Sequence, residues 1–228
     1  MKYIIIGLGS FGSSLAQKLT AHGNEVIGID ASMKKVDALK DKISHTICLD
    51  ASDQYTVAGL PLHDTDAVIV AIGEDQGANI MVTAIFKNLN VKRLISRAID
   101  PLHEHVLQAI GVHEIVHPEE ETAERWAKKL CLRKVVDSFE LNEDFSIVEA
   151  NIPEKYEGKT IQDLNLREKY KLLILTVIRN ESVPNMLGKT SLKSRVKGVP
   201  EPEFILNADD IMVLFGHNKD INRFLETH

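Results

Sequence analysis

Three glycines close to the start of the chain have the spacing of a phosphate-binding loop. Gly7, Gly9 and Gly12 fit the pattern G-x-G-x-x-G, and Asp30 lies 18 residues after the last of them. The loop follows an apolar run typical of a buried strand and precedes a helical pattern over 11–22. In such a loop the glycines permit a tight turn, close approach of phosphates and close packing of the helix. We therefore predict a nucleotide site at a helix N-terminus, rather than a glycine turn with only a structural role.

Two aspartates end the second and third predicted strands. Asp30 ends the run EVIGID, where a carboxylate accepts from both ribose hydroxyls and repels a 2′-phosphate, which disfavours NADP. Asp50 ends the next strand, where it is placed to accept from an adenine amino group. Each has a structural alternative, because Asp30 can cap the helix after it, and Asp50 can share the capping of the next short helix with Ser52 and Asp53.

The fourth and fifth predicted strands end at the same edge of the sheet. Segment 71–75, AIGED, ends the fourth strand at the usual edge of a nucleotide crevice. Arg97 ends the fifth strand, and from there its guanidinium can reach phosphates across the crevice. The alternative for Arg97 is a solvated surface arginine.

The sequence lacks the motifs of a catalytic site. Tyr156 and Lys159 are one residue too close for a Tyr-x-x-x-Lys pair, and there is no Walker lysine motif. Four histidines flank the fifth and sixth predicted strands without an obvious partner set, and we interpret them as surface or helix-end residues: His103, His105, His113 and His117. The nucleotide is therefore predicted to be a signal rather than a reactant.

Six strand and helix patterns alternate over the first 130 or so residues and must position these groups. Apolar runs without polar alternation indicate strands buried on both faces, as in a parallel sheet with helices on each side. We expect strands at 3–7, 25–30, 45–50, 67–73, 93–98 and 114–118. The helices between and after them are expected at 11–22, after Ser32, near 53–59, and at 76–89, 101–110 and 119–131.

The pattern changes near residues 132–138. Alternating segments predict half-buried strands, and short helices should follow two of them: strands at 145–152, 172–178 and 210–216, helices at 160–165 and 217–226. Segment 184–203, rich in Gly, Pro and basic residues, is predicted to be an irregular loop that is solvated or contacts acidic lipid or a channel. The fold class is α/β: a Rossmann-like parallel sheet (1–118), a crossover helix and linker (119–136), and a small α+β domain (137–228).

Composition narrows the classes of function. The 228 residues carry a net charge of -6 with a pI near 5.9, which argues against a general nucleic-acid binder. Two distant cysteines, Cys48 and Cys131, imply neither a disulfide framework nor a zinc site. No apolar run approaches the roughly 18 residues of a membrane span. We therefore expect a cytoplasmic protein that can still dock on a membrane protein.

Several segments together resemble the RCK proteins, and more narrowly the KtrA-like regulatory subunits of bacterial potassium uptake systems, with TrkA halves as the next relatives. The resemblance rests on YIIIGLGSFG, VIGID, DAVIVAIG, IGVHEIVHPEEETA and HNKDINRF, in that order along nearly the whole chain. It implies a Rossmann subdomain, a crossover helix and a C-terminal RCK subdomain. It also implies an octameric ring beneath a KtrB- or TrkH-like membrane subunit, at the inner face of the plasma membrane. ATP and ADP would favour different ring shapes, which open or close the channel.

The resemblance also implies which residues bind the nucleotide. The matching positions are Gly7, Leu8, Gly9, Ser10, Phe11, Gly12, Asp30, Ala31, Asp50, Ala51, Ala71, Ile72, Gly73 and Arg97. Ser10 departs from the family, which often has an arginine there that reaches the terminal phosphate of ATP in the neighbouring subunit. Serine has no charge and less reach, so the choice among ATP, ADP, AMP and NAD(H) stays open.

Two further sites follow from the resemblance. Glu119, in HPEEE, matches a glutamate at which acids from two subunits and the phosphates hold Mg²⁺ or Ca²⁺; the alternative is an acid that complements a helix dipole. Segment 160–170 matches one that binds cyclic di-AMP in some relatives, through Ile161, Gln162 and Arg167, although Arg167 can equally be a solvated helix residue. The expected function is a nucleotide-gated regulator of potassium transport, and the alternatives are an NAD-dependent oxidoreductase and an NAD(H)-sensing regulator.

Overall fold

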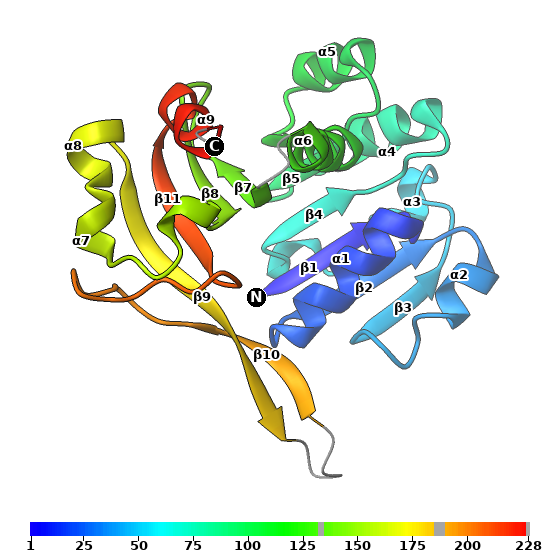
Figure 1. Ribbon diagram of the computed structural model, residues 1–228. Coiled ribbons are helices and arrows are strands. Elements are labelled where there is room, and N and C mark those ends of the chain that lie inside the picture. The colour runs from blue at the N-terminus through cyan, green and yellow to red at the C-terminus, as the bar shows by residue number, and fades with distance from the viewer. Residues whose placement is uncertain (132–134, 185–189, 227–228) are drawn as a thin grey trace. The chain divides into compact units, whose positions relative to one another are not determined.

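A computed structural model describes residues 1–131, 135–184 and 190–226 (Figure 1). It divides into two compact units, Met1–Glu121 and Thr122–His228, and each is described by itself. Among the described helices, none combines the length and the apolar composition that crossing a membrane requires. The domain boundaries given above, at 118 and 136, stay a prediction.

The first unit contains a six-stranded parallel sheet. Its strand order is β3-β2-β1-β4-β5-β6, with β1 in the middle and the direction of progression reversing on either side of it. The strands are β1 (Lys2–Ile6), β2 (Glu25–Asp30), β3 (His45–Cys48), β4 (Ala67–Val70), β5 (Leu94–Arg97) and β6 (Glu114–Val116). All six strands lie where the apolar runs predict them, so the Rossmann-like parallel sheet is confirmed.

Helices cover both faces of this sheet (Figure 1). They are α1 (Ser10–Ala21), α2 (Met33–Asp37), α3 (Gln54–Val57), α4 (Gln76–Asn88) and α5 (Pro101–Ile110), with a 3-10 turn, η1 (Leu62–Asp64). Helix α6 (Pro118–Cys131) begins after β6 and continues from the first unit into the second. The strand β1 shows why neither face is polar. Ile5 packs into the core under α1 and α2, whereas Ile4 and Ile6 pack into the core under α3 and α4.

Two helices of the first unit, α4 and α5, begin at well-defined caps. Asp75 caps α4, since its carboxylate accepts from the backbone nitrogen of Ala78 at 2.9 Å. Asp100 caps α5 by accepting from His103 at 2.8 Å, and Pro101 supplies a first helical residue that needs no hydrogen bond. Gly111 ends α5 in the left-handed conformation, with φ of 79°.

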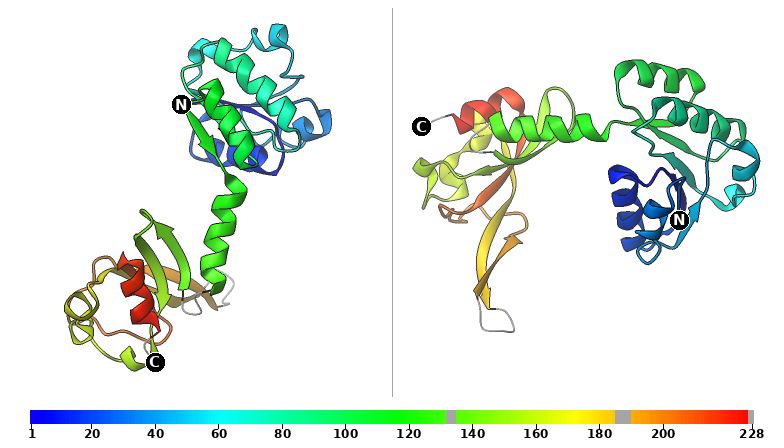
Figure 2. Two further views of the ribbon diagram at one scale, coloured as in Figure 1. Left: turned by 90° about the horizontal axis from the view of Figure 1, so that it is seen from above. Right: turned by 90° about the vertical axis from the view of Figure 1, so that its right-hand side faces the viewer.

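The second unit contains a five-stranded antiparallel sheet of order β10-β9-β11-β8-β7 (Figure 2). The strands are β7 (Val135–Glu140), β8 (Phe145–Asn151), β9 (Leu173–Pro184), β10 (Thr190–Val196) and β11 (Ile211–His217). The helices are η2 (Glu154–Tyr156), α7 (Ile161–Leu164), α8 (Leu166–Tyr170) and α9 (Asn218–Leu225). Phe224 of α9 stacks on Tyr156 and meets Tyr170 edge-on, which anchors that helix to the unit's core.

Two strands of this sheet were missed by the sequence analysis. Residues 135–140 form β7, and residues 190–196 form β10 inside the segment that was predicted to be an irregular loop. The loop prediction is wrong for β10 because cross-strand pairs with β9 satisfy its polar residues. Glu181 lies within 3.4 Å of Arg195 and is also paired with Lys197, and Ser194 bonds Asn180 at 2.7 Å.

Candidate functional site

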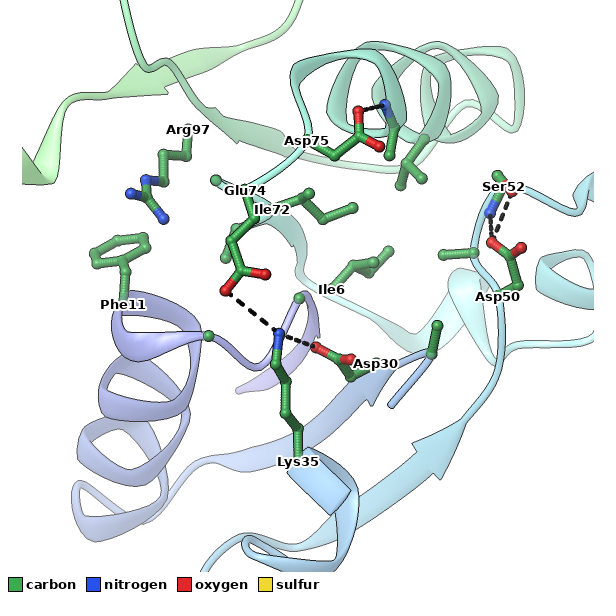
Figure 3. A pocket seen from close by; sticks show the side chains of 18 of the residues that line it. Ile6, Phe11, Asp30, Lys35, Asp50, Ser52, Ile72, Glu74, Asp75 and Arg97 are labelled. Carbon is green, nitrogen blue, oxygen red and sulfur yellow. Dashed lines mark hydrogen bonds and ion pairs between the residues drawn. The ribbon is translucent and has the colours of Figure 1, made fainter. Parts of the chain in front are cut away.

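A pocket of about 410 Å³ lies at the carboxyl ends of the parallel strands, in the first unit (Figure 3). This is the edge at which the strand order reverses around β1, the usual ligand site of such sheets. All of the predicted nucleotide residues except Leu8 and Gly12 line it: Gly7, Gly9, Ser10, Phe11, Asp30, Ala31, Asp50, Ala51, Ala71, Ile72, Gly73 and Arg97. The tertiary structure therefore brings residues from five separate segments to one cavity.

The three glycines of the loop meet three different constraints. Gly7 has φ of +93°, and a Cβ there would lie 2.9 Å from the backbone nitrogen of Ile72. A Cβ on Gly12 would lie 1.9 Å from the carbonyl oxygen of Gly7, so Gly12 serves the packing of α1 against the loop. A Cβ on Gly9 would have nothing within 4 Å, which leaves open space over the loop where it faces the pocket.

Leu8 belongs to the loop but turns away from the pocket. Its side chain is buried in the core under α1 and α2, and its backbone nitrogen donates to Oδ2 of Asp30 at 2.7 Å. The other carboxylate oxygen of Asp30 accepts from the backbone nitrogen of Ser32 at 2.8 Å. Asp30 thus ties the glycine loop to the turn after β2, and each of its oxygens keeps a lone pair for a ribose hydroxyl.

Asp50 lies on the side of the pocket away from Phe11 and Arg97, at the turn after β3 (Figure 3). Its Oδ1 accepts from the backbone nitrogen and the hydroxyl of Ser52, at 2.9 and 2.7 Å, and these bonds lower the pKa of Asp50. Helix α3 is capped by Asp53 instead, which accepts from Tyr55 at 3.0 Å. Asp50 therefore stays ionised in the site, where its other oxygen, Oδ2, can accept from a base.

Three charged residues of the pocket were not singled out by sequence reasoning: Lys35, Glu74 and Asp75, the last of which caps α4. Lys35, in the first turn of α2, places its Nζ 3.8 Å from Oδ2 of Asp30 and 3.7 Å from Oε1 of Glu74. Figure 3 shows Lys35 and Glu74 pointing toward each other, and both line the pocket. The only signal in the sequence was position, since Lys35 follows the strand-ending Asp30 by five residues and Glu74 lies in the AIGED segment.

Arg97 lines the pocket next to Phe11 and is not a solvated surface residue. Its side chain is 15% exposed, and its guanidinium lies 6.0 Å from the centre of the Phe11 ring. A Cβ on Gly73 would come within 2.1 Å of Nη1, so the guanidinium fits only because residue 73 is glycine. Nη2 is paired with Oε1 of Glu119, while Nε is buried without a partner among the described residues. The guanidinium therefore has one N–H donor that the described part of the chain leaves unsatisfied, next to Phe11 of the glycine loop.

Glu119 lies at the start of α6 and lines the pocket, as its predicted contact with phosphate and metal requires. Within the single chain it is the ion-pair partner of Arg97. The described residues contain no group of three His, Cys, Asp or Glu side chains that could hold a metal ion. The metal role of Glu119 stays a prediction, which needs ligands from a phosphate or from a second chain.

The residues predicted for a second ligand lie in the other unit, on two short helices. Ile161 and Gln162 are in α7, Arg167 is in α8, and Asn165 between the helices has φ of 43°. Ile161 packs against the core, whereas Gln162 and Arg167 are exposed. This arrangement leaves the second site a prediction.

One histidine is placed otherwise than expected. His103 is 2% exposed, and neither ring nitrogen has a partner among the described residues, so burial lowers its pKa. His103 lies in the first turn of α5, as a helix-end residue does, but the interpretation of it as a surface residue is wrong. His113 accepts from the backbone nitrogen of Leu94 at 2.9 Å, and His117 lies 3.3 Å from Glu104.

Comparison with known proteins places both parts of the chain in one family. A model of the TrkA-N domain matches residues 3–118, and a model of the TrkA-C domain matches residues 146–228. Ktr system potassium uptake protein C of Bacillus subtilis (strain 168) is 35% identical over 223 residues, and the match covers 98% of this chain and 95% of that protein. Ktr system potassium uptake protein A of the same organism is 32% identical over 223 residues, with the same two coverages.

Solved structures share the fold. The GsuK RCK domain superposes with a TM-score of 0.65 at 17% identity, over 99% of this chain and 47% of that chain. The GsuK channel bound to NAD gives a TM-score of 0.63 at 18% identity, over 98% of this chain and 38% of that chain. This chain thus spans less than half of the solved GsuK chains, and the likeness confirms the RCK fold. With TrkA-N and TrkA-C domains over most of its length and relatives about one third identical, the chain belongs to the TrkA family, as the Ktr potassium uptake proteins do.

Proposed function

We propose that this protein is a nucleotide-sensing regulatory subunit of a potassium uptake system, and not an enzyme. The observation that carries the proposal is the pocket at the carboxyl edge of the parallel sheet. It combines an open glycine loop, a carboxylate for ribose and a cation for phosphate. The relatives named Ktr potassium uptake proteins supply the kind of partner, a membrane-embedded potassium transporter subunit. Through this partner the protein would lie at the cytoplasmic face of the membrane.

The pocket has more carboxylates than cations, so it favours a ligand whose phosphates carry little uncompensated negative charge. Two cations line it, Lys35 and Arg97, and both are already paired with acids. The carboxylates that line it are more numerous: Asp30, Asp50, Glu74, Asp75 and Glu119. Ser10 adds no charge, so ADP or NAD(H) fits better than free ATP, and ATP would bring a divalent cation with it. GsuK, which has the same fold, was solved with NAD.

Arg97 provides a route from the ligand to the rest of the protein. Its guanidinium pairs with Glu119, at the start of α6. A ligand phosphate beside the loop competes for the same guanidinium and leaves the carboxylate free to bind Mg²⁺ or Ca²⁺. Helix α6 continues from the first compact unit into the second. The ligand would thereby favour one of two shapes by the difference in its affinity for them.

The assembly and the further ligands belong to the same proposal. We expect an oligomer, up to an octameric ring, because the metal site at Glu119 is completed by a second subunit. Cyclic di-AMP is the candidate ligand of the second unit, at Ile161, Gln162 and Arg167. Light scattering on the purified protein tests the oligomer, and a protein that stays monomeric with every ligand would contradict the ring.

The direct test is calorimetric titration with ATP, ADP, AMP and NADH, each with and without Mg²⁺. We expect at least one of these ligands to bind, and Asp30→Ala to abolish that binding because the ribose loses its acceptor. Asp41→Ala, at an exposed acid outside the pocket, is the control and should bind normally. Failure of all four ligands to bind the intact protein would end the proposal, and a substrate-dependent change in nicotinamide absorbance would favour an oxidoreductase.

Ser10 is tested by restoring the cation that the family often has. Ser10→Arg should raise the affinity for ATP relative to ADP, since a charge-assisted contact to phosphate is about twice as strong as a neutral one. Ser14→Arg, in the same helix but outside the pocket, is the matched control. An unchanged ratio in Ser10→Arg would show that the arginine's role does not transfer to this chain.

A further inference from the structure

A buried carboxamide joins two walls of the nucleotide pocket. Asn79, in the first turn of α4, is 0% exposed. Its Nδ2 donates to the carbonyl oxygen of Ile72 at 2.9 Å and to that of Arg97 at 3.2 Å. Because carbonyl oxygens only accept, the NH₂ group must be the end that faces the two strands. One side chain therefore connects the segment after β4 with the last residue of β5.

This connection stands where the backbone hydrogen bonds of the sheet stop. The ladder between β4 and β5 ends at the pair Val70–Ser96, and Ile72 and Arg97 lie beyond it. Both of these residues line the pocket, so the strands separate where the ligand would enter. A buried carbonyl left without a partner is unfavourable, and the Asn79 amide removes that penalty for two carbonyls at once. The side chain thus replaces the ladder at the diverging strand ends.

The other end of the amide is held as firmly. Oδ1 of Asn79 accepts from the hydroxyl of Ser96 at 3.0 Å and from that of Thr83 at 3.4 Å, and the two hydroxyls lie 3.0 Å apart. All three side chains are buried. Turning the amide over would place its oxygen against two carbonyl oxygens, so the orientation of the Asn79 amide is fixed.

The separation of the two strand ends controls where the phosphate-binding cation lies. Gly73 follows Ile72, and the guanidinium of Arg97 packs so closely on it that a Cβ would come within 2.1 Å. A small change in the distance between β4 and β5 would therefore move the guanidinium relative to the glycine loop. We propose that Asn79 is a positioning residue, whose carboxamide holds the ends of β4 and β5 at the separation that aims Arg97 at the ligand's phosphate. This inference rests on the proposed function, because it assumes a ligand that carries phosphate.

The test compares a phosphate-bearing ligand with one that has none. Asn79→Leu keeps the bulk of the side chain and removes both bonds to the strand ends. We expect its affinity for ADP to fall by about tenfold or more, while its affinity for adenosine changes by less than about threefold. Thr83→Val is the matched control, because it disturbs the same buried cluster but leaves both bonds to Ile72 and Arg97 in place. Its ratio of ADP to adenosine affinity should equal that of the unchanged protein.

The outcomes separate this inference from the function on which it rests. If the unchanged protein binds neither ADP nor adenosine, the proposed function fails and the inference fails with it. If the unchanged protein binds both, and Asn79→Leu loses the same factor for each, the positioning role alone is refuted. Should Asn79→Leu not fold, Asn79→Ala replaces it, because this change also removes both bonds to the strand ends and leaves the cluster without added bulk. An ADP-specific loss in Asn79→Ala supports the inference, and an equal change for both ligands overturns it.

Discussion

The substitution Gly9→Ala separates ligand binding from folding at the glycine loop. Gly9 has φ of -69°, which alanine adopts without strain, and its added Cβ would have no atom within 4 Å. The folded protein therefore has room for the methyl group. A glycine replaced at a compatible position gains about 0.4–1 kcal/mol of stability, because the unfolded chain loses freedom. The melting midpoint of this unit should stay unchanged or rise by a few degrees.

Nucleotide binding should respond in the opposite direction. The open space above Gly9 is where phosphate oxygens approach the backbone amides, and a methyl group there holds them away. Losing one hydrogen bond to a charged group costs about 1.5–3 kcal/mol, and each 1.4 kcal/mol is about a factor of ten in affinity. We expect the affinity for ADP to fall by about ten- to a hundredfold in calorimetric titrations.

Gly12→Ala is the matched comparison three residues later. Its Cβ would lie 1.9 Å from the carbonyl oxygen of Gly7 and 3.1 Å from Cβ of Ala71, so backbone must move. We expect a loss of about 1–3 kcal/mol or more in the free energy of unfolding, measured by chemical denaturation. A Gly9→Ala protein that binds ADP as tightly as the unchanged protein would refute the placement of phosphate over this loop. A Gly12→Ala protein that is as stable as the unchanged protein and keeps its site would refute the packing of Gly12 against Gly7 and Ala71.

Three further predictions follow from single contacts. Gly73→Ala should displace the guanidinium of Arg97 and weaken ADP binding more than adenosine binding, as measured by titration calorimetry. Burial lowers the pKa of His103 from 6.5, so below that pH the unfolded chain takes up a proton that the folded protein excludes. Chemical denaturation should therefore show a free energy of unfolding that falls as the pH drops below 6.5. His103→Phe should make this fall smaller. Asp210 is 1% exposed and bonds Arg179 through both oxygens, so Arg179→Met should cost about 3 kcal/mol of unfolding free energy.

Each of these predictions has a control at an exposed position. Gly59→Ala adds a Cβ whose nearest neighbour is the carbonyl oxygen of Thr56 at 3.6 Å, so binding and folding should not change. His45→Phe alters an exposed histidine and should leave the pH dependence of stability as it is. Arg93→Met breaks an ion pair with Glu114 that is about half exposed, and should cost less than about 1 kcal/mol. Equal effects in control and test variants would contradict the roles given to Gly73, His103 and Arg179.

Much of the first unit was predictable because its signals are local. Uninterrupted apolar runs such as Ile4–Ile6 mark strands covered on both faces, and their alternation with helical patterns fixes the parallel sheet. The second unit was less predictable at β10, where few apolar residues mark the strand. Its place in the sheet depends on cross-strand partners such as Glu181 and Asn180, which no local pattern reveals.

The same division holds within the site. The glycine loop and Asp30 could be identified as candidates from the sequence alone, since spacing along a strand, turn and helix follows from local backbone geometry. Three contacts could be known only from the folded chain: Arg97 is paired with Glu119, Lys35 meets Glu74 in the pocket lining, and Asn79 ties two strand ends together. These contacts join residues that packing brings together from different strands and helices. Their partners and their burial are therefore properties of the folded chain.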